Sequence, residues 1–164
     1  MLVLKLIVEG LGLGFVLYLI CAIGIRNGAI GMVHLYDITV QKRVCELGLT
    51  TMETIRKRSI LFKCICITGY ILYVLICVYV INGARGIWNG FCQMFIILSI
   101  MNLIDRFLID DYWVGHTDAW NIRGTEDLKP YITKEEKKRK WLMGTVGMAM
   151  IALLLSFIMS LILK

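Results

Sequence analysis

Four long apolar stretches are the feature of this sequence that most constrains its fold. They cover about residues 2–25, 60–81, 87–109 and 141–163. Each is long enough for the ~20 residues that cross the ~30 Å hydrocarbon core of a bilayer. Because lipid offers the backbone no hydrogen-bond partner, each spanning segment has to be a helix. The sequence therefore predicts an all-α integral membrane bundle of four transmembrane helices.

The composition agrees with one membrane domain of residues 1–164, in which residues 26–59 and 110–140 form two structured loops. Hydrophobic residues make up 59% of the chain, and its single proline leaves long helices uninterrupted. Soluble domains have roughly 45–50% apolar residues. The net charge of +6 indicates anionic lipid headgroups as partners rather than nucleic acid, because basic residues beside apolar runs set membrane orientation and bind headgroups.

Lysine and arginine are distributed unevenly between the two ends of the predicted bundle. Of the 18 residues of these types, 15 lie in or beside the two loops, and the other three are Lys5, Arg85 and Lys164. By the positive-inside rule, this pattern predicts a multi-pass inner- or plasma-membrane protein with both loops in the cytoplasm and both termini outside. The first stretch lacks a preceding basic segment and a small-residue cleavage site, so we expect it to be retained.

The loops contain signals for further helices. Thr50-x-x-Glu53 and Thr133-x-x-Glu136 resemble capping boxes, and they predict helices that run into the second and fourth stretches. Residues 31–47 are expected to include a short amphipathic helix at the membrane surface. The short connection over residues 82–86 predicts an antiparallel hairpin of the second and third spans. The 110–140 loop is rich in aromatic residues, and Trp120 and Tyr131 are expected to pack as a cap.

The densest polar cluster begins where the third stretch should still lie in the membrane. Ionisable groups at this depth are costly and usually face a bundle interior or a wet cavity. Arg106 and Asp110 are spaced as an i,i+4 pair, and helical spacing places Asn102, Asp105, Tyr112 and His116 roughly along one face. The candidate site comprises Asp105 and His116 as catalytic residues, Asn102, Arg106, His34, Asp37 and Tyr112 as ligand-binding residues, and Asp110 and Asp111 as metal ligands.

These residue types suggest a specific chemistry. Carboxylates at Asp105, Asp110 and Asp111 are hard oxygen ligands for a divalent cation. His116 titrates near neutral pH and suits a general acid or base. Arg106 suits bidentate phosphate binding. The alternative is an interfacial salt-bridge set that ends the span, with His34 and His116 as ordinary loop residues, and the sequence leaves both open.

Three functions therefore stay open, and the sequence does not decide whether the protein is an enzyme. The first is a cytoplasmic-face site for a lipid headgroup, a phospho-substrate or a divalent cation. The second is a non-catalytic, self-associating or accessory subunit, because Gly10-x-x-x-Gly14 is a helix-packing motif also found in homo-oligomers. A second small-residue stripe, which supports the same function, comprises Thr145, Ala149, Ala152 and Ser156. The third is an oligomeric transporter or channel that uses Asp105 and Glu9, the latter paired with Lys5 four residues earlier.

Overall fold

The computed structural model describes residues 1–163; Lys164, which contributes to the predicted charge distribution, lies outside the described residues. The described chain is all-α, and four of its helices are long and apolar enough to cross a membrane, as predicted. We therefore treat it as a multi-pass membrane protein. The four long helices are α1 (Leu2–Gly24), α3 (Met52–Leu75) continued by η2 (Ile76–Ile81), α4 (Ile87–Leu103) continued by η3 (Ile104–Trp113) and α5 (Val114–His116), and α6 (Lys134–Leu142) continued by η6 (Met143–Gly147) and α7 (Met148–Ile162).

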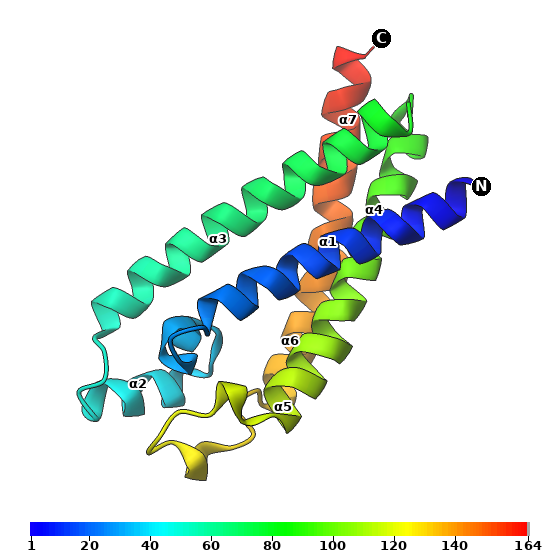
Figure 1. The fold of residues 1–164 in the computed structure, drawn as a ribbon. Helices are drawn as coiled ribbons and strands as arrows, with labels where there is room; N and C mark the ends of the chain where they lie inside the picture. Colours follow the sequence, from blue (N-terminus) through cyan, green and yellow to red (C-terminus); the bar gives the residue numbers. More distant parts are fainter. Residues whose placement is uncertain (164) are drawn as a thin grey trace.

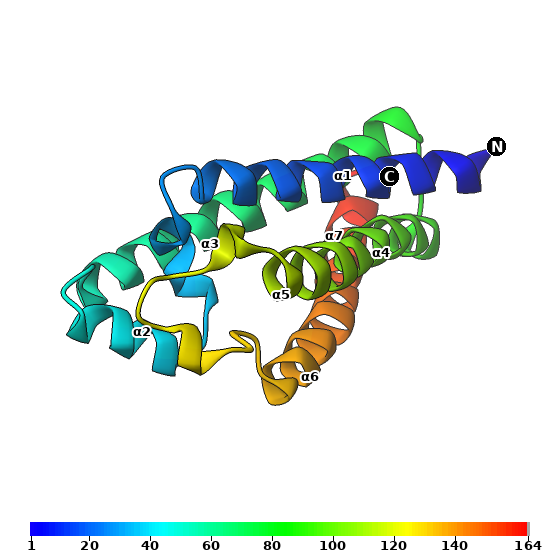
Figure 2. The ribbon, with the colours of Figure 1, turned by 60° about the horizontal axis from the view of Figure 1, so that its bottom comes forward.

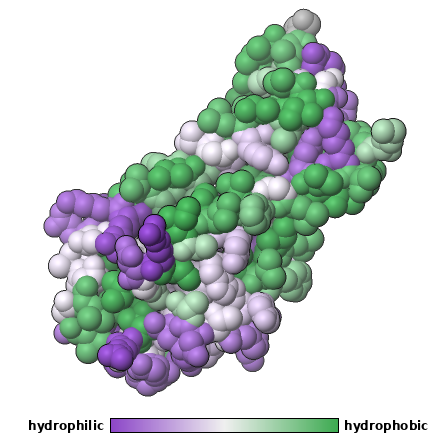
Figure 3. Space-filling view, in the orientation of Figure 1, coloured by the Kyte–Doolittle hydropathy of each residue, from purple (hydrophilic) through white to green (hydrophobic). Residues whose placement is uncertain are grey.

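The shorter elements all lie at one end of the bundle, which we call the loop end (Figure 1). They are η1 (Ala29–Leu35), α2 (Ile38–Glu46), η4 (Asp118–Trp120) and η5 (Glu126–Leu128). The beginning of α1, the end of α7 and the hairpin at residues 82–86 lie at the opposite end (Figures 1 and 2). Hydrophobic surface covers much of the long helices, and hydrophilic surface gathers toward the two ends (Figure 3). This distribution is the one expected of helices that cross a bilayer.

Threonine caps fix where two of the long helices begin. The side chain of Thr133 accepts a hydrogen bond from the Glu136 backbone N–H at 3.2 Å, so α6 starts where it was predicted to start. The predicted cap at Thr50 is wrong by one residue, because Thr51 takes the extended backbone and accepts from the Thr54 N–H at 3.3 Å. Both helices thus extend about two turns beyond the apolar stretches, into the polar loops.

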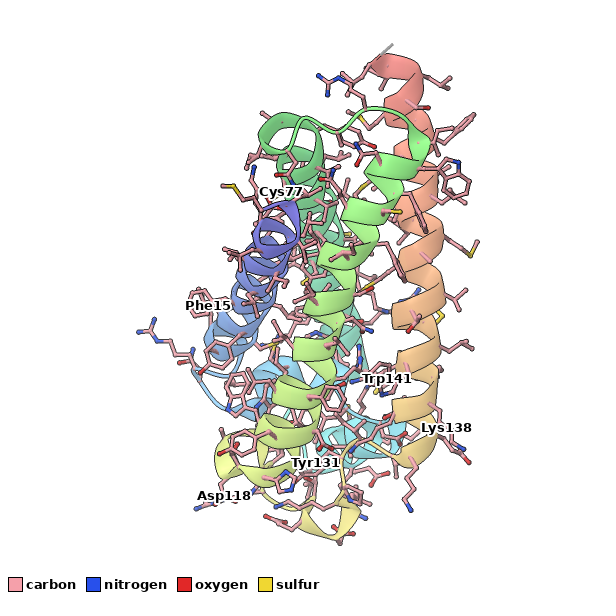
Figure 4. All side chains as sticks on the ribbon, turned by 90° about the vertical axis from the view of Figure 1, so that its right-hand side faces the viewer. Phe15, Cys77, Asp118, Tyr131, Lys138 and Trp141 are labelled. Carbon is pink, nitrogen blue, oxygen red and sulfur yellow. The ribbon has the colours of Figure 1, made fainter. Side chains whose placement is uncertain are left out.

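Close helix contacts are made where glycine removes a side chain. Gly10 of α1 lies against Ile100 of α4, and a Cβ at Gly10 would come within 2.6 Å of the Ile100 Cβ. On the other side of α4, Ala152 and Ser156 of α7 are fully buried. Figure 4 shows α4 between α1 and the α6–α7 helix. The small-residue positions of α1 and α7 therefore serve packing within one chain.

The predicted Lys5–Glu9 ion pair does not form. The Lys5 ammonium donates instead to the Ile81 carbonyl oxygen at 3.1 Å, and the buried Glu9 carboxylate accepts from the Asn82 side-chain amide at 3.0 Å. Since η2 and the hairpin pack beside α1 at this end, tertiary partners replace the local one. The two residues thereby join α1 to the end of the second long helix.

The cap predicted over the loop end is confirmed. Trp120 and Tyr131 are buried, and the Tyr36 hydroxyl donates to the Trp120 carbonyl oxygen at 2.6 Å, which joins the two loops. The expected helix within residues 31–47 is α2, capped by Asp37, whose carboxylate accepts from the Thr39 N–H at 2.8 Å. Hydrogen bonding from Thr39 holds the pKa of the Asp37 carboxyl below its usual range. Asp37, predicted as a ligand-binding residue, thus caps a helix here.

Candidate functional site

The candidate site centres on Arg106, in the π-helical segment η3 that continues α4. Its guanidinium contacts Asp105 at 2.6 Å, pairs with Asp110, and donates through Nε to the Asn102 side-chain oxygen at 3.2 Å. The side chains of Arg106 and Asp110 are only 12% and 10% exposed. Four residues predicted from the sequence therefore meet in one cluster, which we call the Arg106 cluster: Asn102, Asp105, Arg106 and Asp110.

The π-helical geometry explains how both carboxylates reach one guanidinium. In an α-helix of 3.6 residues per turn, residues five apart point about 140° away from each other. The i→i+5 hydrogen bonding of a π-helix widens the turn and brings such residues back together. Asp105 and Asp110 can therefore both contact Arg106. Short π segments occur frequently at functional sites, which makes this part of the helix a reasonable place for one.

Two residues of the predicted site, Tyr112 and His116, lie outside the Arg106 cluster. Tyr112 is 62% exposed, and His116 is also exposed. Their rings stack on each other with centroids 6.2 Å apart. His116 Nδ1 also lies 2.9 Å from the backbone oxygen of Asp111. Roles for Tyr112 and His116 in a site stay predictions.

Two lysines of α6 reach this region from the fourth long helix. The Lys140 ammonium donates to both carboxylate oxygens of Asp110, at 3.1 and 3.0 Å. Lys137 contacts the exposed carboxylate of Asp111 at 2.5 Å. Asp110 is therefore shared between Arg106 and Lys140. Two carboxylates and two cations balance within the buried group, as burial of charge requires.

A cavity of about 300 Å³ lies beside the Arg106 cluster. Met101 and Met148 lie farther from the loop end than Asp105 and Lys140 do on the same helices, whereas Leu17 and Phe62 lie level with the charged wall. Its charged wall comprises Asp105, Arg106, Asp110, Lys140 and Lys63, and its apolar wall includes Leu17, Phe62, Ile67, Met101 and Met148. Trp120 of the cap and Tyr36 of the first loop also line it, so the cavity lies between all four long helices and both loops.

Lys63 differs from the other charged residues of the cavity wall. It lies on α3, across from the Arg106 cluster, and no carboxylate pairs with its ammonium in residues 1–163. The charges of Arg106 and Lys140 balance those of Asp105 and Asp110, so Lys63 adds one excess positive charge to the cavity wall. Lys63 is an exposed residue, so its charge can attract an anion to the cavity but needs no buried counter-ion.

His34 lies beside the cavity and not within its wall. Its ring packs on Phe62, with centroids 5.1 Å apart, and neither ring nitrogen has a hydrogen-bond partner. Burial, together with the charges of Arg58 and Lys63, lowers the pKa of His34 to about 4. The imidazole is therefore neutral at pH 7, and it serves as a packing group for Phe62.

The carboxylates expected to bind a divalent cation are engaged by lysine and arginine. Within residues 1–163, no three His, Cys, Asp or Glu side chains gather closely enough to hold a metal ion. Asp105 and Asp110 contact Arg106, while Asp111 lies outside with Lys137. A divalent cation therefore stays a prediction, one that would require these ion pairs to open.

The chain matches no protein-family model, no curated protein and no solved structure. Its candidate site therefore has to be interpreted from geometry alone.

Several wall residues of the cavity are not indicated by the sequence. Cys21, Cys66 and Tyr70 line it, but each reads as an ordinary bundle-packing residue in an apolar stretch. Their only common signal is modest polarity inside a span, and Cys66 and Tyr70 are one turn apart on α3. That signal is too weak to locate a cavity without knowing which helices are neighbours.

Proposed function

We propose that the cavity binds a membrane-resident amphiphile with an anionic headgroup, at the cytoplasmic face of the membrane. The observation that carries this proposal is one cavity with apolar walls and an ammonium, Lys63, that lacks an acidic partner. A phosphate or carboxylate headgroup would supply the missing charge, and a hydrocarbon chain would cover the apolar wall. The cytoplasmic placement rests on the 15 of 18 basic residues that lie at the loop end.

The size of the cavity favours a ligand with one chain. Small-molecule pockets commonly measure ~300–1,000 Å³, and this cavity has about 300 Å³. Its apolar wall reaches from Leu17 and Phe62, level with the charged residues, to Met101 and Met148 deeper in the bundle. A single alkyl or prenyl chain fits such a space better than the paired chains of a common phospholipid.

Lys63, rather than Arg106, is the residue we assign to the headgroup. The Arg106 guanidinium already contacts Asp105, Asp110 and Asn102. Direct binding of a phosphate by Arg106 would have to break these buried contacts, which is costly. In this proposal the Arg106 cluster forms a rigid, electrically balanced wall beside the headgroup.

The alternative of a self-associating subunit loses part of its original support. It rested on the small-residue stripes and on the lack of a catalytic signature. Gly10 packs against Ile100, and Ala152 and Ser156 are buried on the α7 side, although Thr145 of the same stripe is exposed. Association through another surface stays a prediction, as does transport through Glu9 and Asp105. The amphiphile site is the function for which the described residues offer a specific binding place.

The proposal can be tested with hexadecyl phosphate as the probe and the protein in lipid nanodiscs. Replacement of Lys63 by glutamine should weaken binding about tenfold, because a charge-assisted contact contributes roughly 1.5–3 kcal/mol. Lys42→Gln is the matched control, since Lys42 is an exposed lysine of α2 away from the cavity. Hexadecanol and inorganic phosphate separate the contributions of the chain and the anion. Equal binding by the parent and Lys63→Gln, or equally tight binding of inorganic phosphate, would overturn the proposal.

A further inference from the structure

A groove on the outside of the bundle lies close to the cavity. It runs between the loop-end halves of α1 and α3, and its apolar wall includes Ile20, Ile23, Leu61 and Ile65. Ile23, Leu61 and Ile65 are all more than half exposed on helices long enough to cross a membrane. In a bilayer this surface faces hydrocarbon, so a lipid chain is its natural contact.

Phe62 separates this groove from the cavity. It is the one side chain that lines both the groove and the cavity among the residues described here. His34 packs on its ring from the first loop, 5.1 Å away between centroids. Because aromatic side chains change rotamer without moving the backbone, rotation of one ring would join the two spaces.

The segment η1 holds the groove open at the loop end. It packs between α1 and α3, where Gly31 lies directly against the Gly24 carbonyl oxygen with no room for a side chain. Arg58 of α3 donates to the Ile30 carbonyl oxygen of η1 at 3.2 Å. Because η1 packs between them, it separates the loop end of α1 from α3.

Two cations on α3 flank the Phe62 position. Arg58 lines the outer groove, and Lys63 lines the inner cavity. In residues 1–163 no carboxylate forms an ion pair with either one. Both residues are exposed, so an anionic headgroup would meet an uncompensated positive charge beside the groove at Arg58 and another beside the cavity at Lys63.

We infer that a single-chain anionic lipid enters the cavity sideways from the bilayer, through the groove and past Phe62, while its headgroup passes from Arg58 to Lys63. The inference rests on the proposed function and adds the route and the source of the ligand. The ligand is drawn from the membrane leaflet and not from water. Phe62 is then a specificity-determining residue, because its ring limits the thickness of the chain that passes.

Trp120 provides a direct measure of entry, since it is 1% exposed and lines the cavity. Replacing Trp88, Trp113 and Trp141 by phenylalanine leaves it as the sole tryptophan. A hexadecyl phosphate with bromine on the carbons next to the phosphate, which would lie nearest the cap, quenches tryptophan only on close contact. Rapid mixing with vesicles that contain this lipid should quench Trp120 in the parent, and the time course gives the entry rate.

Variants at the groove should change that rate. Phe62→Ala should raise the entry rate about fivefold, whereas Arg58→Gln should lower it about fivefold, because rim charges act mainly on association. Phe157→Ala, at an exposed aromatic residue of α7, and Arg56→Gln, at an exposed cation elsewhere on α3, should leave the rate unchanged. Phe62→Leu is a milder substitution if Phe62→Ala does not fold.

The outcomes distinguish the route from the site. Normal quenching of Trp120 with rates unaffected at Phe62 and Arg58 would overturn lateral entry and leave the proposed function intact. Absence of quenching in a folded parent would overturn the proposed function itself. If the triple tryptophan variant does not fold, a hexadecyl phosphate with a photoreactive group next to the phosphate should label the segment around Trp120 in the unmodified chain, at rates that follow the same order.

Discussion

Arg106 and Asp110 form an ion pair one helical turn apart, in a part of η3 where both side chains are almost fully buried. Asp105 and Lys140 complete the group, so that two cations face two carboxylates. Charges removed from water are tolerated only when paired, and loss of one partner leaves another charge exposed to a low dielectric. The stability of this end of the bundle should therefore depend on all four residues together.

Replacement of Arg106 by methionine should lower the free energy of unfolding by about 3–5 kcal/mol, the cost typical of breaking a buried pair. The reason is that Asp105 and Asp110 would keep only Lys140 as a counter-charge. Thermal or denaturant unfolding in a mild detergent, followed by circular dichroism, measures the change. Adding Asp105→Asn to Arg106→Met should recover part of the loss.

The control for this prediction is Arg139→Met. Arg139 pairs with Glu136 at 3.3 Å, but its side chain is 74% exposed, and exposed ion pairs contribute about 0–1 kcal/mol. Equal destabilisation by Arg106→Met and Arg139→Met would show that burial of the Arg106 cluster has no energetic consequence.

Gly144 should be intolerant of a side chain because it lies against Asn102. A Cβ at Gly144 would collide with the Asn102 side chain, which accepts the Arg106 Nε–H. Overpacking of this kind costs about 1–3 kcal/mol, so Gly144→Ala should lower the unfolding midpoint and loosen the Arg106 cluster.

Gly147 is the matched position in the same η6 segment, and a Cβ there would meet no atom within 4 Å. Because alanine favours helix over glycine by up to about 1 kcal/mol, Gly147→Ala should be neutral or slightly stabilising. A comparison of unfolding midpoints tests both. Similar effects of the two substitutions would contradict the close packing of η6 on α4.

The two adjacent threonines before α3 give a third prediction. Thr51→Ala should cost about 1 kcal/mol through loss of the N-cap, and Thr133→Ala should cost a similar amount at α6. Thr50→Ala should have little effect. Hydrogen exchange of the first-turn amides of α3 checks this locally, and faster exchange in Thr50→Ala than in Thr51→Ala would show that the cap is at residue 50.

Most of the fold could be predicted from the sequence, because the bilayer dictates the length and the helical backbone of each span. A span needs ~20 apolar residues and helical backbone, so the four stretches predict the four long helices. The caps show where local reasoning loses resolution. Thr50 and Thr51 fit similar patterns, and the choice depends on the backbone entering from the turn at Gly48, which has a positive φ of 70°.

The candidate site was predictable only in part. The spacing of Arg106 and Asp110 predicted their ion pair, which the structure confirms. The place of Tyr112 was not predictable, because α-helical periodicity fails once η3 adopts a wider turn. Lys63 gained significance only from its place across a cavity, and a cavity depends on contacts between helices that are distant in the sequence.

His34 gives the final prediction, a pH dependence of stability. Burial and the neighbouring cations lower its pKa from the ordinary value of 6.5 to about 4 in the folded protein. Between these values the unfolded chain binds more protons than the folded one, so stability rises with pH across this window. Stability from His34 is fully present above pH 6.5 and is lost as the pH falls toward 4.

The comparison with His34→Gln isolates this contribution, because glutamine does not titrate. The difference in unfolding free energy between the parent and His34→Gln should shift against the parent as the pH falls from 7 to 4.5, and it should stay level from 7 to 8. Nearby carboxylates titrate in both proteins and largely cancel in the difference. A difference that is unchanged between pH 7 and 4.5 would mean that the imidazole is hydrated, and that His34 does not hold the Phe62 ring from a water-free position.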